Sequence, residues 1–167
     1  AELGPAKSLI AESFVKFSRE VSIIAVRGQD GDVKTWALAE NHHHNGILSH
    51  SIVPAPNSTD LQPVAQDYIT RLLNHLNYVG VLTLELFVTE QGLYANEMAC
   101  RVHNSGHWSI EGAICSQFEN HIRAVAGLPL GATDVVRPTV MVNIIGQHPK
   151  SEDVLALKGA HLHLYNK

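Results

Sequence analysis

The stretch VLTLELFVTEQGLYANEMA, residues 81–99, decides the fold because it contains two strand-like runs around a short polar turn. The runs at 81–88 and 93–99 are rich in branched and apolar residues, and the intervening TEQG carries a glycine. This spacing predicts an antiparallel hairpin. The sequence is therefore expected to build its core on an antiparallel sheet rather than on a helical bundle.

Further strands and two helices are expected on either side of this hairpin. The apolar spacing predicts strands at 20–27, 33–39, 139–146 and 160–166, and helices at 61–76 and 116–127. Asp60 is expected to cap the first helix, and Ser116 with Glu119 forms a capping box for the second. Residues 40–56 lack a clean period and predict a loop with a short strand. Hairpins with interleaved helices indicate the α+β class.

Composition and charge exclude several classes of protein. The chain has 167 residues, which suffice for one core with a small appended lobe. A net charge of −4 argues against nonspecific nucleic-acid binding, so no nucleic-acid partner is expected. No apolar run approaches the roughly 18 residues of a membrane span, and no signal peptide is visible. The two cysteines form no disulfide framework, so a reducing, cytoplasmic location is expected.

The loop length of the 81–99 hairpin determines whether two glutamates meet. A three-residue loop at 90–92 places Glu85 directly opposite Glu97, with Cβ atoms about 5 Å apart. A two-residue loop would instead place Asn96 opposite Glu85 and turn Glu97 to the other face. Opposed carboxylates on a rigid strand pair suit Mg²⁺, with Asn96 as a further oxygen donor. The alternative is that both glutamates are solvated on an exposed face.

The polar run that follows the hairpin contains groups that bind anions and move protons. Arg101 offers a planar fork for a carboxylate or phosphate, and His103 can donate to an anion or move a proton. Gly106 allows the backbone to approach a ligand closely. His103 and His107 also have the spacing of a helical zinc pair, although the Asn-Ser-Gly between them, which includes Asn104, is a poor helix sequence.

At these residues the chain resembles a known family. The run at 96–131, NEMACRVHNSGHWSIEGAICSQFENHIRAVAGLPLG, closely resembles the 5-(carboxyamino)imidazole ribonucleotide synthase (PurK) family of ATP-grasp enzymes. Three other stretches are similar to the same family, namely AESFVKFSREVSIIAVRG at 11–28, ENHHHNGIL at 40–48 and HLHLYNK at 161–167. The resemblance therefore extends over most of residues 8–167.

The resemblance implies a fold, a reaction and its ligands. Residues 1–127 would form the C-terminal lobe of an ATP-grasp domain, an antiparallel sheet with flanking helices. Residues 128–167 would begin a small C-terminal β-rich domain. The implied enzyme is a ligase of purine biosynthesis that uses ATP and Mg²⁺ to convert bicarbonate to carboxyphosphate. The carboxyl group then passes to 5-aminoimidazole ribonucleotide. Family members often dimerise, so a homodimer is one expectation.

The resemblance also implies roles for individual residues. Glu85 and Glu97 would hold magnesium, in agreement with the register argument. The bicarbonate and carboxyphosphate pocket would comprise Arg101, His103 and Asn104, and Lys167 would lie near the phosphate of the ribonucleotide. The nucleotide site would comprise Glu12, Ser13, Phe14, Val15, Glu20, His43, Ala95 and Asn96.

Some features depart from the family pattern. Cys100 stands where proline is usual, and Asn45 replaces the usual aspartate. The family's lobe with ATP-binding lysines and a glycine-rich lid does not precede Ala1, so the chain alone is expected to be inactive and the native chain to be longer. The alternatives are a noncatalytic domain, a histidine-rich zinc binder, and another ATP-grasp ligase that uses formate or an amino acid.

Overall fold

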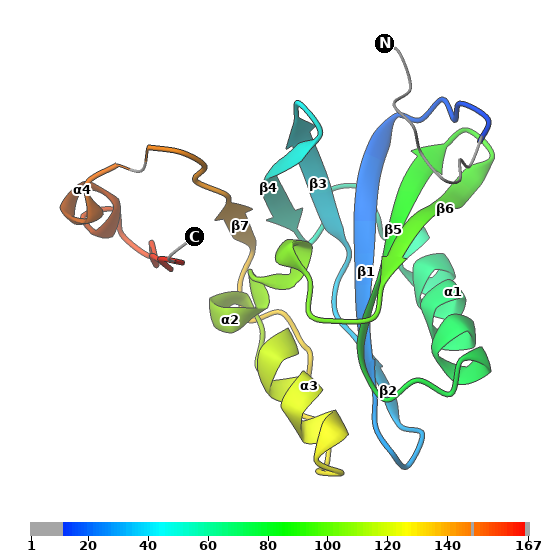
Figure 1. The fold of residues 1–167 in the computed structure, drawn as a ribbon. Coiled ribbons are helices and arrows are strands. Elements are labelled where there is room, and N and C mark those ends of the chain that lie inside the picture. Colours follow the sequence, from blue (N-terminus) through cyan, green and yellow to red (C-terminus); the bar gives the residue numbers. More distant parts are fainter. Residues whose placement is uncertain (1–11, 148, 166–167) are drawn as a thin grey trace, which may run out of the picture.

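The sheet is the centre of the molecule. The computed structural model describes residues 12–147 and 149–165, in which seven strands form one sheet of order β6-β5-β1-β3-β4-β7, with β2 paired to β1 (Figure 1). Every strand pairing is antiparallel. The strands are β1 (Arg19–Arg27), β2 (Val33–Thr35), β3 (Ala39–His44), β4 (Ile47–Val53), β5 (Gly80–Thr89), β6 (Gly92–Ala99) and β7 (Thr139–Val142). The helices are α1 (Leu61–His75), η1 (Asn104–Gly106), α2 (Ser109–Gly112), α3 (Gln117–Val125) and α4 (Ser151–Leu155).

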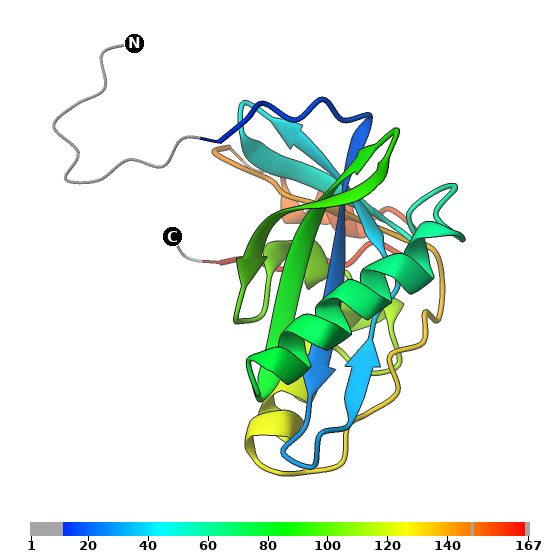
Figure 2. The same ribbon diagram turned by 90° about the vertical axis from the view of Figure 1, so that its right-hand side faces the viewer.

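The two faces of the sheet are covered differently. Helix α1 lies across one face, as Figure 2 shows, and its buried residues Ala65, Ile69 and Leu73 pack against alternate residues of β1 and β5. The opposite face is covered by α3 and the η1–α2 segment, around the buried rings of Trp36 and Trp108. Because strand residues alternate between faces, β1 supplies apolar residues to both cores.

The β5–β6 hairpin has the predicted glutamate pair but not the predicted loop. Thr89 pairs with Gly92, so the loop has two residues, and the expectation of a three-residue loop is wrong. A β-bulge then shifts the register, because Leu86 pairs with Ala95 whereas Glu85 pairs with Glu97. Asn96 is therefore an extra residue in β6. The opposition of the two glutamates is confirmed, although the bulge produces it rather than the loop.

The β3–β4 hairpin replaces the loop that the sequence predicted. Residues 33–39 were expected to form one strand, but β2 ends at Thr35 and β3 begins at Ala39. The turn between β3 and β4 is Asn45-Gly46, with φ values of 50° and 75°, as in a hairpin turn with two left-handed residues. Polar side chains such as Asn41 are buried in β3. The pairing with β1 and β4 stabilises β3 as a strand, although its polar composition does not predict one.

The two long helices agree with the sequence except at one cap. Helix α1 ends one residue before its expected end, but Asp60 makes no side-chain capping bond. Instead, the Ser58 carbonyl accepts hydrogen bonds from the backbone N–H groups of Leu61 and Gln62. For α3, the Ser116 hydroxyl accepts from the Glu119 backbone N–H at 3.2 Å, as the capping box predicts.

The C-terminal segment departs most from the sequence prediction. Strand β7 is shorter than expected and lies at the edge of the sheet, and α4 is set apart from the sheet (Figure 1). Residues 160–165 form no strand, because no neighbouring strand offers a ladder to the alternating sequence HLHLY. This tail contacts the body through His163, whose Nε2 lies 2.8 Å from Glu111 Oε1. Lys167 lies outside the described residues.

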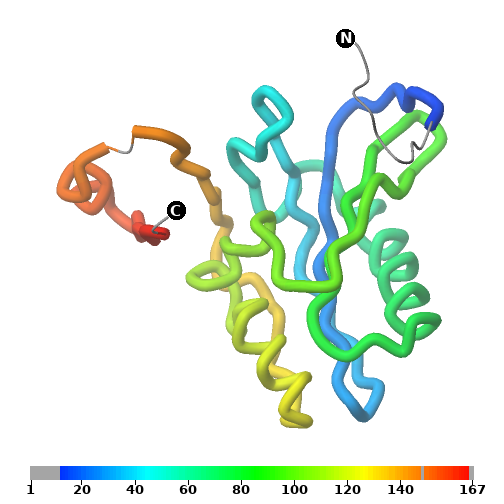
Figure 3. Tube along the Cα trace, viewed as in Figure 1, coloured from blue at the N-terminus to red at the C-terminus, as the bar shows by residue number. Residues whose placement is uncertain are grey.

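The chain path brings the N-terminal segment to the β5–β6 hairpin. Figure 3 shows the described residues before β1 running beside the tip of this hairpin. The contact is specific, because the Ser18 backbone N–H donates to the Val88 carbonyl at 2.9 Å. Within residues 12–147 and 149–165, none of the helices has the length and apolarity needed to cross a membrane.

Candidate functional site

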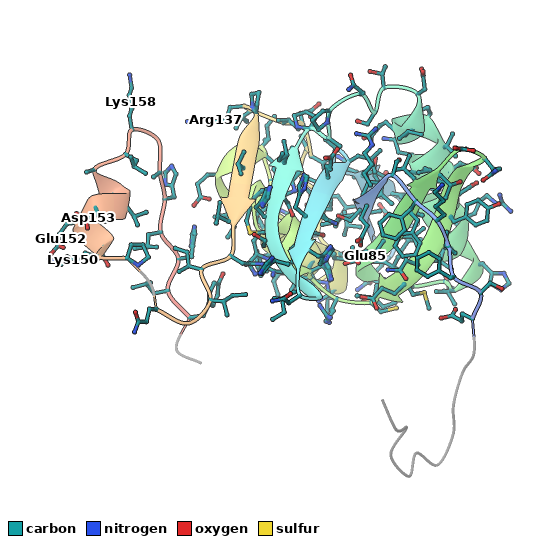
Figure 4. The ribbon with its side chains drawn as sticks, turned by 90° about the horizontal axis from the view of Figure 1, so that it is seen from above. Glu85, Arg137, Lys150, Glu152, Asp153 and Lys158 are labelled. Carbon is teal, nitrogen blue, oxygen red and sulfur yellow. The ribbon has the colours of Figure 1, made fainter. Side chains whose placement is uncertain are left out.

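Acidic and imidazole side chains gather on the half of the sheet face that α3 leaves uncovered. The register places Ser22 of β1 beside Glu85 of β5, and Glu85 beside Glu97 of β6, in one row across the sheet. Glu20 lies two residues from Ser22 on the same face, next to His43 of β3. Figure 4 labels Glu85 on the sheet, apart from the charged side chains of α4.

Glu85 belongs to two groups of side chains that could hold a metal ion. The Glu85 carboxylate lies close to Glu20 and His43 on one side, and close to Glu97 and His103 on the other. In each group the ligand atoms lie within 4.8 Å of one another. His43 Nδ1 is 3.4 Å from Glu20 Oε2. Glu85 is thus the central residue of the site.

The environment of Glu85 favours a positively charged ligand. Burial raises the pKa of the Glu85 carboxyl, and the negative charge of Glu97 raises this pKa further. Two facing carboxylates are unfavourable unless a cation or a proton offsets their charge. The residues present therefore fit a hard divalent cation such as Mg²⁺, which binds through one or two carboxylates together with phosphate oxygens.

The backbone of His103 is fixed by a glutamine that the sequence did not single out. Gln117, at the start of α3, is fully buried. Its Oε1 accepts from the His103 backbone N–H at 2.9 Å, and its Nε2 donates to the His103 carbonyl at 2.7 Å. Gly106 lies against this side chain, and a Cβ there would come within 2.6 Å of Gln117 Oε1. The glycine is thus required by close packing rather than by ligand approach.

The imidazole ring of His103 points toward Glu85. Its Nε2 is 3.3 Å from Glu85 Oε1, and its Nδ1 is 2.9 Å from the Ser105 hydroxyl. Burial lowers the pKa of His103, and the charge of Arg101 lowers this pKa further. The structure thus favours a neutral ring at the edge of the carboxylate pair.

The remaining residues of the polar run take different positions. Arg101 is exposed, and its guanidinium donates to the Val102 carbonyl at 3.1 Å. Asn104 begins the short helix η1. His107 turns away from the carboxylates, with its Nδ1 2.9 Å from the His103 carbonyl. Among the described residues, His103 therefore groups with glutamates and not with His107, which disfavours a zinc pair.

A hollow of about 380 Å³ lies beside the carboxylates. The rings of Phe17 and Phe87 are stacked there, with centroids 4.3 Å apart and an interplanar angle of 11°. The hollow brings together six of the residues predicted to bind nucleotide, and the two phenylalanines complete its lining. The six are Glu12, Ser13, Phe14, Val15, Ala95 and Asn96.

Several residues of the site carried no signal in the sequence. The sequence around these residues is typical of an ordinary helix, strand or linker. Gln117 lies in a helix, Ser22 and Phe87 lie in strands, and Phe17 lies in a linker. Phe87 could have been assigned from the hairpin register, because it lies two residues from Glu85 and therefore shares its face. The role of Gln117 depends on the path of a loop that comes from another element.

Two family models match the chain. The ATP-grasp domain model matches residues 2–118, and the model of the phosphoribosylaminoimidazole carboxylase C-terminal domain matches residues 139–167. The first match alone covers more than half of the chain. It agrees with the antiparallel sheet and its flanking helices.

Proteins named N5-carboxyaminoimidazole ribonucleotide synthase are similar to nearly the whole chain. N5-carboxyaminoimidazole ribonucleotide synthase of Vibrio parahaemolyticus is 52% identical over 163 residues, which are 98% of this chain and 43% of the relative. The crystal structure of the synthetase from Thermus thermophilus is 55% identical, with a TM-score of 0.89, and covers 91% of this chain and 42% of that chain.

A second similar structure holds ligands. The synthase of Aspergillus clavatus, in complex with ADP and 5-aminoimidazole ribonucleotide, is 33% identical with a TM-score of 0.75. The similarity covers 80% of this chain and 37% of that chain. The chain thus spans less than half the length of the relatives it matches. The chain belongs to the ATP-grasp family, and within that family it is similar along nearly its whole length to the N5-carboxyaminoimidazole ribonucleotide synthases.

Proposed function

We propose that this chain forms one wall of the active site of an ATP-dependent carboxylating ligase. The enzyme would phosphorylate bicarbonate with ATP to give carboxyphosphate and ADP. The amine of 5-aminoimidazole ribonucleotide would then capture the carboxyl group and release phosphate. The observation that carries this proposal is the juxtaposition of Glu85 and Glu97 beside the hollow lined by Glu12–Val15 and Asn96.

The nucleotide would lie along the hollow, with its phosphates toward the glutamates. The stacked rings of Phe17 and Phe87 offer an apolar surface beside which a purine could pack. Glu20 and His43 lie close to Glu85 and would contact the sugar and phosphates. Bound Mg²⁺ would offset negative charge on the transferring phosphoryl group.

The acceptor anion would lie on the other side of Glu85. The positive charge of Arg101 acts on both Glu85 and His103, and its guanidinium suits a bicarbonate or carboxyphosphate oxygen. His103 and Asn104 would complete this pocket. Lys167, which lies outside the described residues, remains a proposed contact for the phosphate of the ribonucleotide.

The same proposal includes a domain boundary near residue 127. The two family models support it, since they leave residues 119–138 between them. Residues 1–127 would belong to the ATP-grasp lobe and residues 128–167 to the C-terminal domain. Strand β7 would then connect the two, because it pairs with β4 of the main sheet.

Titration calorimetry of the chain with Mg·ADP tests nucleotide binding. Glu97→Gln is expected to weaken binding by about tenfold or more, or roughly 1.4 kcal/mol, because it removes one carboxylate of the cation pair. Glu90→Gln is the matched control, since this exposed residue lies in the turn of the same hairpin. Equal weakening by both substitutions would count against the proposed cation pair.

A chimera tests the reaction. The Thermus thermophilus relative would carry this chain in place of its matching 42%. The chimera is expected to form ADP only when bicarbonate is present, and Arg101→Ala is expected to lower that rate at least about a hundredfold, or roughly 2.7 kcal/mol. Bicarbonate-independent turnover, or full activity of the variant, would refute the proposed role of Arg101.

A further inference from the structure

A buried pair of serines connects β1 to the ring of His103. Ser22 and Ser105 are 1% and 0% exposed, and the Ser22 hydroxyl donates to Ser105 Oγ at 2.9 Å. Ser105 Oγ is in turn 2.9 Å from His103 Nδ1. The other ring nitrogen, Nε2, lies 3.3 Å from Glu85 Oε1. Four side chains therefore form a continuous line from the strand to the carboxylate.

The backbone of Ser105 decides the direction of this line. Its N–H points at His103 Nδ1 at 3.3 Å, and a backbone N–H can only donate. Nδ1 must therefore accept. The Ser22 hydroxyl donates to Ser105 Oγ, which leaves the Ser105 hydroxyl proton free to donate to Nδ1 as well. In a neutral imidazole, one nitrogen accepts and the other carries the proton, so the proton is on Nε2.

We propose that Ser105, supported by Ser22, is a positioning residue that holds His103 in the Nε2–H tautomer, so that the ring donates a hydrogen bond into the site. This inference deepens the proposed function, because it concerns the same site. A nitrogen that carries a proton has no lone pair for a metal or for a substrate proton. His103 is therefore a donor to Glu85 or to a bound anion. It is neither a cation ligand nor the general base.

Nuclear magnetic resonance of the nitrogen-15-histidine-labelled chain tests this assignment without any nucleotide. Spectra recorded in weakly alkaline buffer, where histidine is neutral, distinguish a protonated ring nitrogen from an unprotonated one. The His103 signals are identified by their loss in His103→Gln. The expected wild-type result is an unprotonated Nδ1 and a protonated Nε2. A predominant Nδ1–H form would overturn the proposal.

Serine variants test whether the hydroxyls set the tautomer. Ser105→Ala keeps the backbone donor at 3.3 Å from Nδ1 but removes the shorter hydroxyl contact at 2.9 Å, so it is expected to raise the Nδ1–H fraction at least twofold. Ser22→Ala is expected to change this fraction in the same direction by less. Ser105→Cys replaces the hydroxyl with a somewhat larger thiol that is a weaker donor, so its Nδ1–H fraction should lie between those of wild type and Ser105→Ala. Ser18→Ala is the matched control, because the Ser18 hydroxyl donates to the Val88 carbonyl, in a contact that does not include His103. An unchanged His103 ring spectrum in folded Ser105→Ala and Ser22→Ala would refute the positioning role of Ser105.

His103→Gln in the chimera separates a donor from a base. The glutamine amide can donate from about the position of Nε2 but cannot accept a proton. If His103 is a donor, His103→Gln should retain at least tenfold more activity than His103→Ala. Equal losses would refute the donor role. An inactive parent chimera would instead refute the proposed function, and the tautomer spectra would stand independently.

Discussion

The β5–β6 and β3–β4 hairpins contribute to the same open face but were not equally visible in the sequence. The first has apolar strands, and its glutamates stand out against them. The second contains the polar strand β3, which is recognised as a strand only by its pairing with β1 and β4. Both hairpins contain a bulge next to a residue of the candidate site, at Glu85/Leu86 and at His42/His43. The two hairpins differ in sequence pattern, but in both a β-bulge lies next to a functional side chain.

The largest expected effect separates the contributions of the two hairpins to cation binding. Glu85→Gln should lower Mn²⁺ affinity by about tenfold or more, because the Glu85 carboxylate lies close both to Glu97 and to the Glu20–His43 pair. His43→Gln, from the other hairpin, should lower it by only about threefold, or roughly 0.7 kcal/mol. Electron paramagnetic resonance of free Mn²⁺ measures both values. His44→Gln is the control, and a larger effect of His43 than of Glu85 would reverse the comparison.

The next largest effects are expected from deleting the extra residue of each bulge, Asn96 in β6 or Ser49 in β4. Deletion of Asn96 restores a regular register in which Glu97 still faces Glu85. The free energy of unfolding of this deletion variant should therefore stay within about 1 kcal/mol of wild type, whereas its binding of Mg·ADP should weaken. Deletion of Ser49 removes the acceptor of the Asn143 backbone N–H, a 2.8 Å bond, and should cost about 0.5–1.5 kcal/mol. Urea unfolding and calorimetry measure these effects.

The opposite outcome would be informative for both deletions. If removal of Asn96 unfolded the chain, the bulge would serve the fold rather than the nucleotide. If removal of Ser49 weakened Mg·ADP binding as much as removal of Asn96, the bulge in β3–β4 would contribute directly to the site.

The pH dependence of stability should be set by the β5–β6 hairpin. The folded-state pKa of Glu85 is raised above its ordinary value of 4.5, so its stabilising contribution is fully present below that pH. The contribution is lost as the pH rises through the raised folded-state pKa. Thermal unfolding of the wild type should therefore show a decrease across this window that Glu85→Gln lacks. A parallel decrease in the variant would assign the effect to other groups.

The smallest expected effect concerns the turn of the β3–β4 hairpin. Asn45 has a φ of 50°, which favours asparagine or glycine over alanine. Asn45→Ala should cost about 0.5–1 kcal/mol, whereas Asn45→Gly should change stability by less than about 0.5 kcal/mol. Thermal unfolding measures the difference. Equal stability of the two variants would show that the turn conformation does not limit this hairpin.

The sequence predicted the parts of the site that lie close together along the chain. Apolar runs around a turn located the Glu85–Glu97 hairpin, and the polar residues after it drew attention to His103. Short-range geometry relates these positions, because side chains alternate in a strand and paired residues face one another. The loop length was nevertheless wrong, since a bulge leaves no mark in the periodicity.

The sequence by itself determined the α+β class, the main helices, the β5–β6 hairpin and the polar run, because these follow from local periodicity and turn chemistry. Only the tertiary structure decided how β3 becomes a strand, which glutamine holds His103, and which way its ring donates. Buried polar contacts such as Gln117 with His103 and Ser22 with Ser105 join elements far apart in the chain. Their geometry depends on how the whole sheet packs, and no local pattern encodes it.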